Sequence, residues 1–298
     1  MADILLIKNV EIERQGKKVL DLSQEEICVS ASDKIAILGE NGAGKTSLLN
    51  AILGEISFSG EIIKDFHQKD CGVVFQKNSY HELLKVHELV ALVLKKPKVR
   101  LSDFLAEYAL TDLKTKYIKD LSGGEQQRLT LSLILANQKR IYFFDELTSS
   151  LDYKKRLTLL SMMKAKTSEA TVFNVTHYFE EIEDWATKVL ILNQGHLVFY
   201  GETSDFFKKF KHDSAVKVVS SELSKLDQMT CRKIKSVDII DTGDGRMYIC
   251  SNQSEQDKVK DFLTDANISY TVIKQNIYTT YLLSSIMLSD KNQPSLEV

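Results

Sequence analysis

The sequence predicts an α/β fold built on a largely parallel sheet, followed by a small α+β extension. Short apolar runs typical of buried strands recur up to about residue 200, and stretches with helical spacing of apolar residues separate them. Strands that alternate with helices indicate a parallel sheet, because each parallel connection needs a crossover. After Gly201 the alternation loosens, which indicates a separate, smaller unit.

The predicted strands are short and rich in β-branched and aliphatic residues. In the first part of the chain they cover residues 4–12, 27–30, 34–38, 60–63, 72–75, 141–144, 172–175 and 189–192. The predicted helices of this part cover residues 46–53, a helical block over 77–119, and 126–137. We therefore expect a helical subdomain at about residues 77–139, inserted between strands of one sheet.

The second part of the chain has weaker patterns. Residues 208–217 are basic and polar and are typical of a linker or an exposed helix. Beyond them, we expect strands at 237–240 and 247–250 and a helix near 256–263. The sequence thus predicts two domains, 1–210 and 211–298, in agreement with the roughly 150 residues of a typical domain.

Composition excludes several classes of protein. Hydrophobic residues make up 43% of the chain and charged residues 27%, which excludes a disordered or collagen-like chain. With 39 basic and 41 acidic residues the net charge is −2, so no overall field favours nucleic acid, and no nucleic-acid partner is expected. The four cysteines are scattered, and no run reaches the roughly 18 apolar residues of a membrane span. We expect an intracellular protein that is at most peripheral at a membrane.

A glycine-rich loop follows the predicted strand 34–38 and precedes a helix. It fits GxxxxGK[ST] with Gly39, Glu40, Asn41, Gly42, Ala43, Gly44, Lys45 and Thr46, and Ser47 follows. Glycines let successive N–H groups point at phosphate oxygens, and the helix start adds its positive dipole end. In this pattern the lysine reaches the β- and γ-phosphates and the threonine hydroxyl binds Mg²⁺. A plain glycine turn is the alternative, but a turn does not need the Lys-Thr pair.

Two carboxylates, Asp145 and Glu146, follow the apolar run 141–144. Ligands of open α/β sheets bind at the carboxyl ends of the strands, so both side chains are expected near the phosphates. Asp145 is suited to hold Mg²⁺ directly or through water, and Glu146 to polarise or deprotonate an attacking water. The alternative is two solvated acids at a strand end.

Residues 121–128, LSGGEQQR, resemble the signature of ABC transporter ATP-binding subunits, with Glu125 in place of the commonest glutamine. A phosphate loop, this signature, an apolar strand ending in Asp-Glu and a downstream histidine occur in the family's order over residues 4–207. The resemblance implies a P-loop NTPase core with a mostly parallel sheet, an antiparallel β subdomain and an inserted helical subdomain. It also implies an ATPase that uses ATP and Mg²⁺ at the inner, cytoplasmic face of the cell membrane.

The signature residues can also be interpreted physically. Ser122, Gly123 and Gly124 open a predicted helix, and such a start binds anions. The resemblance implies a head-to-tail dimer, as a homodimer or heterodimer, in which these residues close over the γ-phosphate held by the partner's phosphate loop. The alternative is an ordinary helix cap.

Three further residues match family positions. Gln76 resembles the glutamine that contacts Mg²⁺ or the attacking water and links the site to the membrane subunits. His177 resembles the histidine that touches the γ-phosphate, and Asp152 resembles the acid that couples the two sites of the dimer.

The chain departs from the family pattern at two places. Leu147 stands where a proline usually stiffens the loop, which predicts looser positioning without loss of chemistry. No aromatic residue occurs near residues 14–16 to stack on adenine, so Arg14 is the candidate for stacking through its guanidinium plane.

The sequence therefore predicts the ATP-hydrolysing motor of a transporter whose membrane-spanning subunits are separate chains. The overall look of the chain, with a C-terminal extension like those of many exporter-type ATPases, favours export. A ribosome-associated translation factor is the main alternative, although those proteins usually carry two nucleotide domains and a basic linker. A nucleotide switch without turnover is a further alternative, against which Glu146 and His177 argue.

Overall fold

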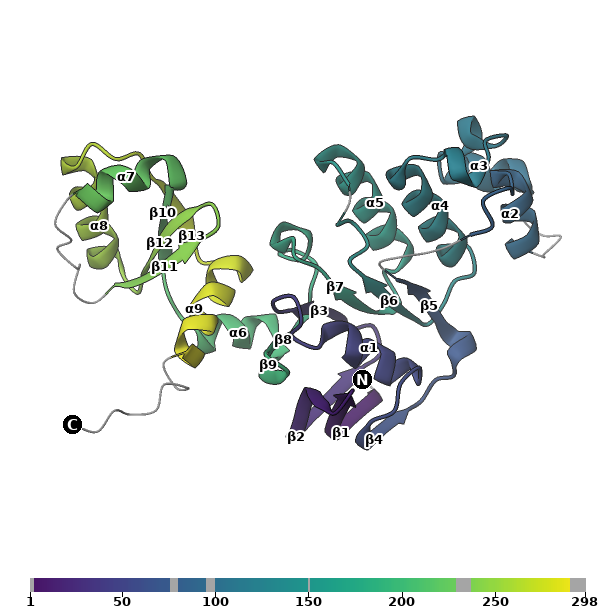
Figure 1. The fold of residues 1–298 in the computed structure, drawn as a ribbon, viewed down its shortest axis with the longest axis horizontal. Helices are drawn as coiled ribbons and strands as arrows, with labels where there is room; N and C mark the ends of the chain where they lie inside the picture. Colours follow the sequence, from purple (N-terminus) through teal and green to yellow (C-terminus); the bar gives the residue numbers. More distant parts are fainter. Residues whose placement is uncertain (1–2, 76–79, 95–99, 150, 229–236, 290–298) are drawn as a thin grey trace. The chain divides into compact units, whose positions relative to one another are not determined.

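The computed structural model describes residues 3–75, 80–94, 100–149, 151–228 and 237–289. The chain divides into two compact units, Met1–Tyr200 and Gly201–Val298 (Figure 1). The boundary predicted at 210/211 falls just after the first helix of the second unit, α6 (Thr203–Lys209). The two units are described separately.

The first unit contains a nine-stranded sheet in the order β4-β1-β2-β9-β8-β3-β7-β6-β5. Its strands are β1 (Asp3–Arg14), β2 (Lys17–Ser30), β3 (Lys34–Leu38), β4 (Ser59–Lys64), β5 (Cys71–Val74), β6 (Ile141–Asp145), β7 (Thr171–Val175), β8 (Lys188–Asn193) and β9 (His196–Glu202). The neighbours β5, β6, β7, β3 and β8 pair in parallel, whereas β1 pairs antiparallel with both β2 and β4. The predicted α/β class with a mostly parallel sheet is confirmed.

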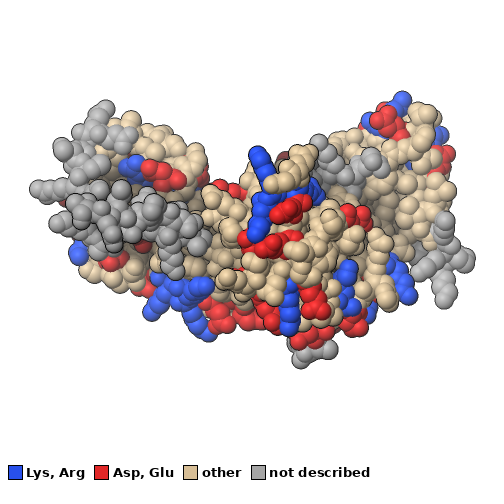
Figure 2. Space-filling model, turned by 60° about the horizontal axis from the view of Figure 1, so that its bottom comes forward, with Lys and Arg blue, Asp and Glu red and all other residues tan. Residues whose placement is uncertain are grey.

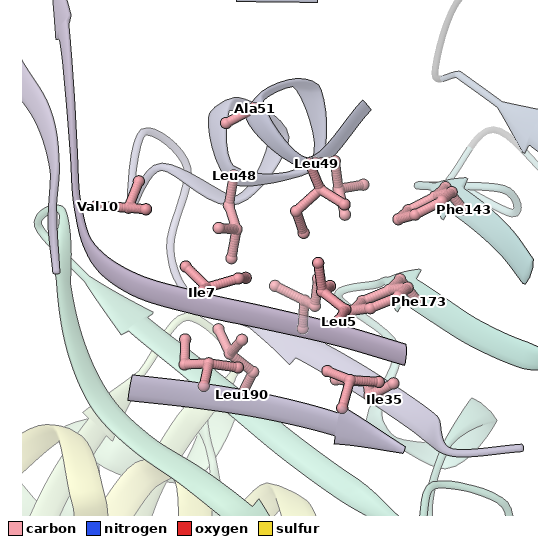
Figure 3. Close-up of a cluster of buried hydrophobic side chains, with 14 of the residues drawn as sticks. Leu5, Ile7, Val10, Ile35, Leu48, Leu49, Ala51, Phe143, Phe173 and Leu190 are labelled. Carbon is pink, nitrogen blue, oxygen red and sulfur yellow. The ribbon is translucent and has the colours of Figure 1, made fainter. Parts of the chain in front are cut away.

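Helices cover both faces of this sheet. They are α1 (Lys45–Leu53), α2 (Val86–Leu94), α3 (Leu101–Glu107), α4 (Gly123–Leu135) and α5 (Tyr153–Lys166). Phe143 of β6 packs in a core with α1, where Leu48 and Leu49 point at the sheet (Figure 3). Its neighbours Tyr142 and Phe144 belong to a second core with α2, α3, α4 and α5. Successive side chains of a strand face opposite sides, which explains why this strand is apolar throughout.

These two cores fix the strand ends that carry the polar residues of the site. Phe143 and Phe173 stack with ring centroids 4.9 Å apart and an interplanar angle of 5°. Both are at most 1% exposed, and each fully buried aromatic side chain of this kind contributes about 1.5–3 kcal/mol. The register of β6 against β7 is thereby held at the position where Asp145 lies opposite Val175.

The second unit is a separate α+β body. Its four strands form an antiparallel sheet in the order β11-β12-β10-β13. After α6, its elements are β10 (Ser214–Val219), α7 (Ser220–Gln228), β11 (Asp238–Thr242), β12 (Gly245–Cys250), α8 (Gln253–Asp265), β13 (Thr271–Lys274) and α9 (Ile277–Ser289). From β10 to β13, this order is the split β-α-β arrangement of ferredoxin-like domains.

One sequence expectation in this unit is wrong. Residues 208–217 were expected to form a linker or an exposed helix, but β10 begins at Ser214 and lies in the middle of the sheet. Val216 and Val218 are fully buried there. The strand was not predicted because lysines dominate the segment before it and because its own alternation of apolar residues is short.

Charged side chains of both signs are interspersed on the face of the molecule shown in Figure 2. This mixture agrees with the nearly equal numbers of basic and acidic residues in the chain. Within the described part of the chain, none of the helices has both the length and the apolar character needed to cross a lipid bilayer.

Candidate nucleotide-binding site

The loop between β3 and α1 has a backbone that only glycine accommodates at two positions. Gly39 has φ +147°, and a Cβ there would lie 2.2 Å from the carbonyl oxygen of Leu192 on β8. Gly44 has φ +98°, and its Cβ would lie 3.0 Å from Leu20 Cδ1 on β2. The loop therefore packs closely against β8 and β2, and it ends where α1 begins.

Lys45 is the first residue of α1, and its side chain is only 6% exposed. Its ammonium donates to the carbonyl oxygens of Gly39 at 2.7 Å and Glu40 at 2.9 Å. Burial lowers the pKa of Lys45, while the nearby carboxylates of Glu146 and Asp145 raise it. The ammonium is thus folded over the loop, where phosphate oxygens bind in this motif.

Thr46 and Asp145 connect the phosphate loop to the end of β6. Thr46 Oγ1 donates to Asp145 Oδ2 at 2.9 Å. Burial raises the pKa of Asp145, which is 5% exposed, and the Thr46 hydrogen bond and the charge of Lys45 oppose this shift. A hydroxyl and a carboxylate oxygen side by side are the hard oxygen ligands that Mg²⁺ prefers, so these residues fit that ion.

Glu146 follows directly, and its backbone is strained. It has φ +53°, a left-handed conformation that costs a non-glycine residue energy and that clusters at functional sites. Its N–H donates to the carbonyl oxygen of Val175 on β7 at 3.0 Å. Glu146 Oε1 lies 2.8 Å from His177 Nε2, so two of the predicted catalytic side chains touch.

A pocket of about 440 Å³ lies over the loop. Its lining combines the loop, the start of α1, the two catalytic candidates and one residue of β2: Val19, Asn41, Gly42, Ala43, Gly44, Lys45, Thr46, Ser47, Glu146 and His177. Val19 is a pocket residue that sequence reasoning missed. Arg14, the predicted adenine contact, ends β1 opposite Lys17 and does not line this pocket. Val19, on β2 just after the Gly16 turn, lines the pocket. A search for an aromatic side chain does not detect this aliphatic residue.

The signature residues lie outside this pocket. Ser122 caps α4, which starts at Gly123, and the N–H of Ser122 donates to Glu125 Oε2 at 2.7 Å. That bond, with Lys116 nearby, lowers the pKa of Glu125 to about 2. Gly124 lines a second hollow of about 110 Å³, shared with Arg128 among others.

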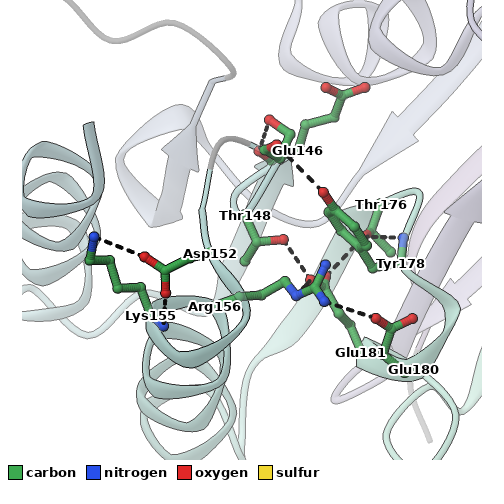
Figure 4. Close-up of polar contacts among 10 residues, drawn as sticks. Glu146, Thr148, Asp152, Lys155, Arg156, Thr176, Tyr178, Glu180 and Glu181 are labelled. Carbon is green, nitrogen blue, oxygen red and sulfur yellow. Dashed lines mark hydrogen bonds and ion pairs between the residues drawn. The ribbon is translucent and has the colours of Figure 1, made fainter. Parts of the chain in front are cut away.

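The remaining candidate site residues lie away from the pocket or outside the residues that the structure describes. Asp152 caps α5, accepting from the N–H of Lys155 at 3.0 Å and pairing with its ammonium at 2.8 Å (Figure 4). Leu147, at the usual proline position, is buried in the core with α4 and α5. Gln76 lies outside the described residues. The roles assigned to Asp152, Gln76 and the signature remain predictions.

A phosphate loop lies between a parallel strand and a helix, with Lys45, Thr46 and Glu146 around one pocket and Asp145 hydrogen-bonded to Thr46, and this arrangement defines a P-loop NTPase. Comparison with known proteins specifies the family. Residues 22–149 match the family model described as ABC transporter. The match spans the phosphate loop, the signature and the two strand-end carboxylates. The similar proteins are named as ATP-binding subunits of such transporters, which are ATPases, and this similarity supports ATP binding by the chain.

Two curated relatives illustrate the similarity. The methionine import ATP-binding protein MetN 1 of Listeria innocua is 28% identical over 232 residues, which cover 70% of this chain and 69% of the relative. The spermidine/putrescine import ATP-binding protein PotA of Legionella pneumophila is 29% identical over 249 residues, covering 78% and 68%. A solved ATP-binding subunit of an ABC transporter shares the fold, with a TM-score of 0.61, 20% identity, and coverage of 70% and 93%. Both curated relatives are named for import and do not support the expectation of export.

Proposed function

We propose that this chain is the ATP-hydrolysing motor of an ABC transporter and acts at the cytoplasmic face of the cell membrane on separate membrane-spanning subunits. The observation that carries the proposal is the meeting of Lys45, Glu146 and His177 in one pocket over the phosphate loop. Transfer of a phosphoryl group to water requires a general base, a cation that binds the phosphates and a further polar group. Glu146, Lys45 and His177 supply these in turn.

Each residue has a defined task in this mechanism. Lys45 and the loop N–H groups hold the β- and γ-phosphates of ATP and offset the charge that develops there. Glu146 accepts a proton from the water that attacks the γ-phosphorus, and the bond to the β-phosphate oxygen breaks, which releases ADP and phosphate. His177 Nε2 lies 2.8 Å from Glu146 Oε1, where it orients this carboxylate, and the resemblance to the family gives His177 a contact with the γ-phosphate when ATP is bound.

Thr46 and Asp145 would hold Mg²⁺, and the ion supplies charge neutralisation on the phosphates. Their 2.9 Å hydrogen bond brings the two oxygen ligands together from α1 and β6. Gln76 is proposed as a further contact of the ion or the attacking water.

We also propose that two ATP-binding subunits work as a head-to-tail dimer. Ser122, Gly123 and Gly124 do not line the pocket of their own chain, although a helix start with this sequence binds anions. In the proposed dimer, the signature residues bind the γ-phosphate of the ATP that the partner's phosphate loop holds. Asp152 would then couple the two nucleotide sites. The direction of transport is set by the membrane subunits, and the names of the two relatives favour import over export.

The second unit is proposed to be a regulatory or dimer-stabilising extension. None of the residues lining the described pocket belongs to it.

The experiment is an ATPase assay of the purified chain, alone and after co-expression with the membrane protein encoded beside it. Stable co-purification, with ATPase activity that the membrane protein changes, supports the proposal. Lys45→Met is the control, because loss of the ammonium removes a charged hydrogen bond worth about 1.5–3 kcal/mol, or about 10–150-fold in affinity for ATP. ATPase activity that no membrane protein affects, together with co-sedimentation with ribosomes, would overturn the transporter assignment.

A further inference from the structure

A buried polar cluster adjoins the candidate catalytic residues (Figure 4). At its centre is Glu181, the last residue of the short 3-10 helix η4 (Phe179–Glu181), with only 3% of its surface exposed. Nothing in the mechanism described above uses this carboxylate. A buried carboxylate is unfavourable unless hydrogen bonds or an ion pair compensate it, so its partners indicate what it does.

The two oxygens of Glu181 hold two different loops. Thr148 Oγ1 donates to Oε1 at 2.6 Å, and Thr176 Oγ1 donates to Oε2 at 2.9 Å. Thr148 follows Glu146 by two positions, and Thr176 directly precedes His177. Both threonines are buried, at 2% and 4% exposure. One side chain thus connects the loop that carries the proposed base with the loop that carries the proposed histidine.

A third segment joins through Arg156 of α5. Its Nε lies 3.9 Å from Glu181 Oε1, and its Nη2 lies 3.1 Å from Oε1 of Glu180. The guanidinium also lies over the ring of Tyr178, 3.9 Å from its centre. Because α5 starts directly after its cap Asp152, the same cluster reaches the helix of the proposed coupling residue.

Burial raises the pKa of Glu181, and the two threonine hydroxyls and Arg156 oppose that shift. A hydrophobic side chain of similar volume would fill the space without a desolvation penalty, but it could not connect the two threonines with Arg156. We propose that Glu181 is a positioning residue that sets the spacing of Glu146 and His177 for ATP hydrolysis through its hydrogen bonds to Thr148 and Thr176. This proposal rests on the proposed function.

The test removes one hydroxyl at a time without changing side-chain volume. Thr148→Val and Thr176→Val each release one loop from Glu181, and Thr148→Ser and Thr176→Ser keep the hydroxyl. Misplacement of a reacting group by about 1 Å can lower the rate about 100-fold, so we expect kcat to fall by about 10–100-fold in the valine variants. The KM for ATP should stay close to that of the wild type, and the serine variants should recover most of kcat.

The matched control is Thr167→Val. Thr167 is also fully buried, and its hydroxyl donates to the carbonyl oxygen of Met163 at 2.8 Å, at the other end of α5. Loss of this hydroxyl should cost stability and leave kcat unchanged. Thermal melting of all variants sets an assay temperature at which each is folded, and if Thr148→Val does not fold, Thr176→Val decides alone.

A double-mutant cycle separates positioning from general destabilisation. Because Thr148 holds the loop that carries Glu146, Thr148→Val should cost little in a Glu146→Gln background, measured as single turnovers with excess enzyme. The proposal is overturned if the valine variants keep wild-type kcat, if Thr167→Val loses as much, or if the losses of Thr148→Val and Glu146→Gln multiply. An inactive wild type, or full activity of Glu146→Gln, would instead overturn the proposed function.

Discussion

His177 Nε2 lies 2.8 Å from Glu146 Oε1, although the two residues are 31 positions apart in the sequence. The contact follows from strand pairing, since β6 and β7 run in parallel and Asp145 lies opposite Val175 at their carboxyl ends. The residues that follow each strand therefore emerge together, beside the phosphate loop that ends β3 on the other side of β7. The proposed sites of phosphate binding and water activation thus lie at three adjacent strand ends.

The first prediction concerns Glu146→Gln. Glutamine has the same shape but accepts no proton from water, so ATP turnover should fall by about 10²–10⁴-fold, the size of a general-base contribution. ATP binding should survive, because Lys45 and the loop N–H groups are unchanged. Steady-state phosphate release and binding of a fluorescent ATP analogue measure the two effects.

Glu55→Gln provides the control for this substitution. Glu55 lies just after α1, where its carboxylate accepts from Gln68 Nε2 at 3.3 Å, and it does not line the pocket. Its replacement should leave turnover unchanged. Wild-type turnover in Glu146→Gln would show that another group is the base.

The second prediction concerns Gly39. In Gly39→Ala the new Cβ would lie 2.2 Å from the Leu192 carbonyl oxygen, so β8 or the loop must shift. Backbone strain of about 1–2 kcal/mol adds to an overpacking cost of about 1–3 kcal/mol, and the free energy of unfolding should fall by about 2–5 kcal/mol. Urea denaturation followed by circular dichroism measures it.

Gly54→Ala separates strain from collision. Gly54 caps α1 with φ +80°, but a Cβ there meets no atom within 4 Å. Only the strain of about 1–2 kcal/mol should appear. If the free energy of unfolding fell equally in the two variants, the structure around Leu192 would accommodate the new Cβ of Gly39→Ala without an energetic penalty.

The third prediction links stability to pH at Asp145. Burial raises the pKa of this carboxyl above the ordinary 3.8, so folding at neutral pH carries a penalty for keeping it ionised. Asp145→Asn removes this penalty, and the melting temperature should rise at pH 7 while ATP turnover is lost. The gain should shrink as the pH falls towards 3.8, because the wild-type carboxyl is then protonated in both states. Thermal melts from pH 7 down to pH 4 test this, and a lower melting temperature for Asp145→Asn at pH 7 would contradict it.

The sequence predicted those parts of the site that are local in the chain. The loop 39–46 and the strand-end pair Asp145 and Glu146 are contiguous motifs, and their spacing alone indicates the chemistry. Val19 and Glu181 were not predicted from the sequence, because their contacts come from tertiary packing and no short motif marks them.

The fold was predicted to a similar extent. Strands that are apolar on both faces, such as 34–38 and 141–144, were located almost to the residue. By contrast, β10 was missed because a basic segment precedes it, and α5 was missed because its lysines and arginine obscure a weak apolar stripe. Patterns with a strong period are readable from sequence, whereas marginal ones depend on what the element packs against.

The fourth prediction concerns a chain that ends at Glu202. The residues that line the described pocket fall between Val19 and His177, and Glu202 is the last residue of β9, so the nine-stranded sheet stays complete. The shortened chain should fold and bind the ATP analogue with unchanged affinity, as titration would show. A change in turnover at unchanged affinity would assign the second unit a regulatory role, since nothing in the pocket has been removed. Loss of ATP binding by a fragment that still melts cooperatively would show that the second unit supports the site itself.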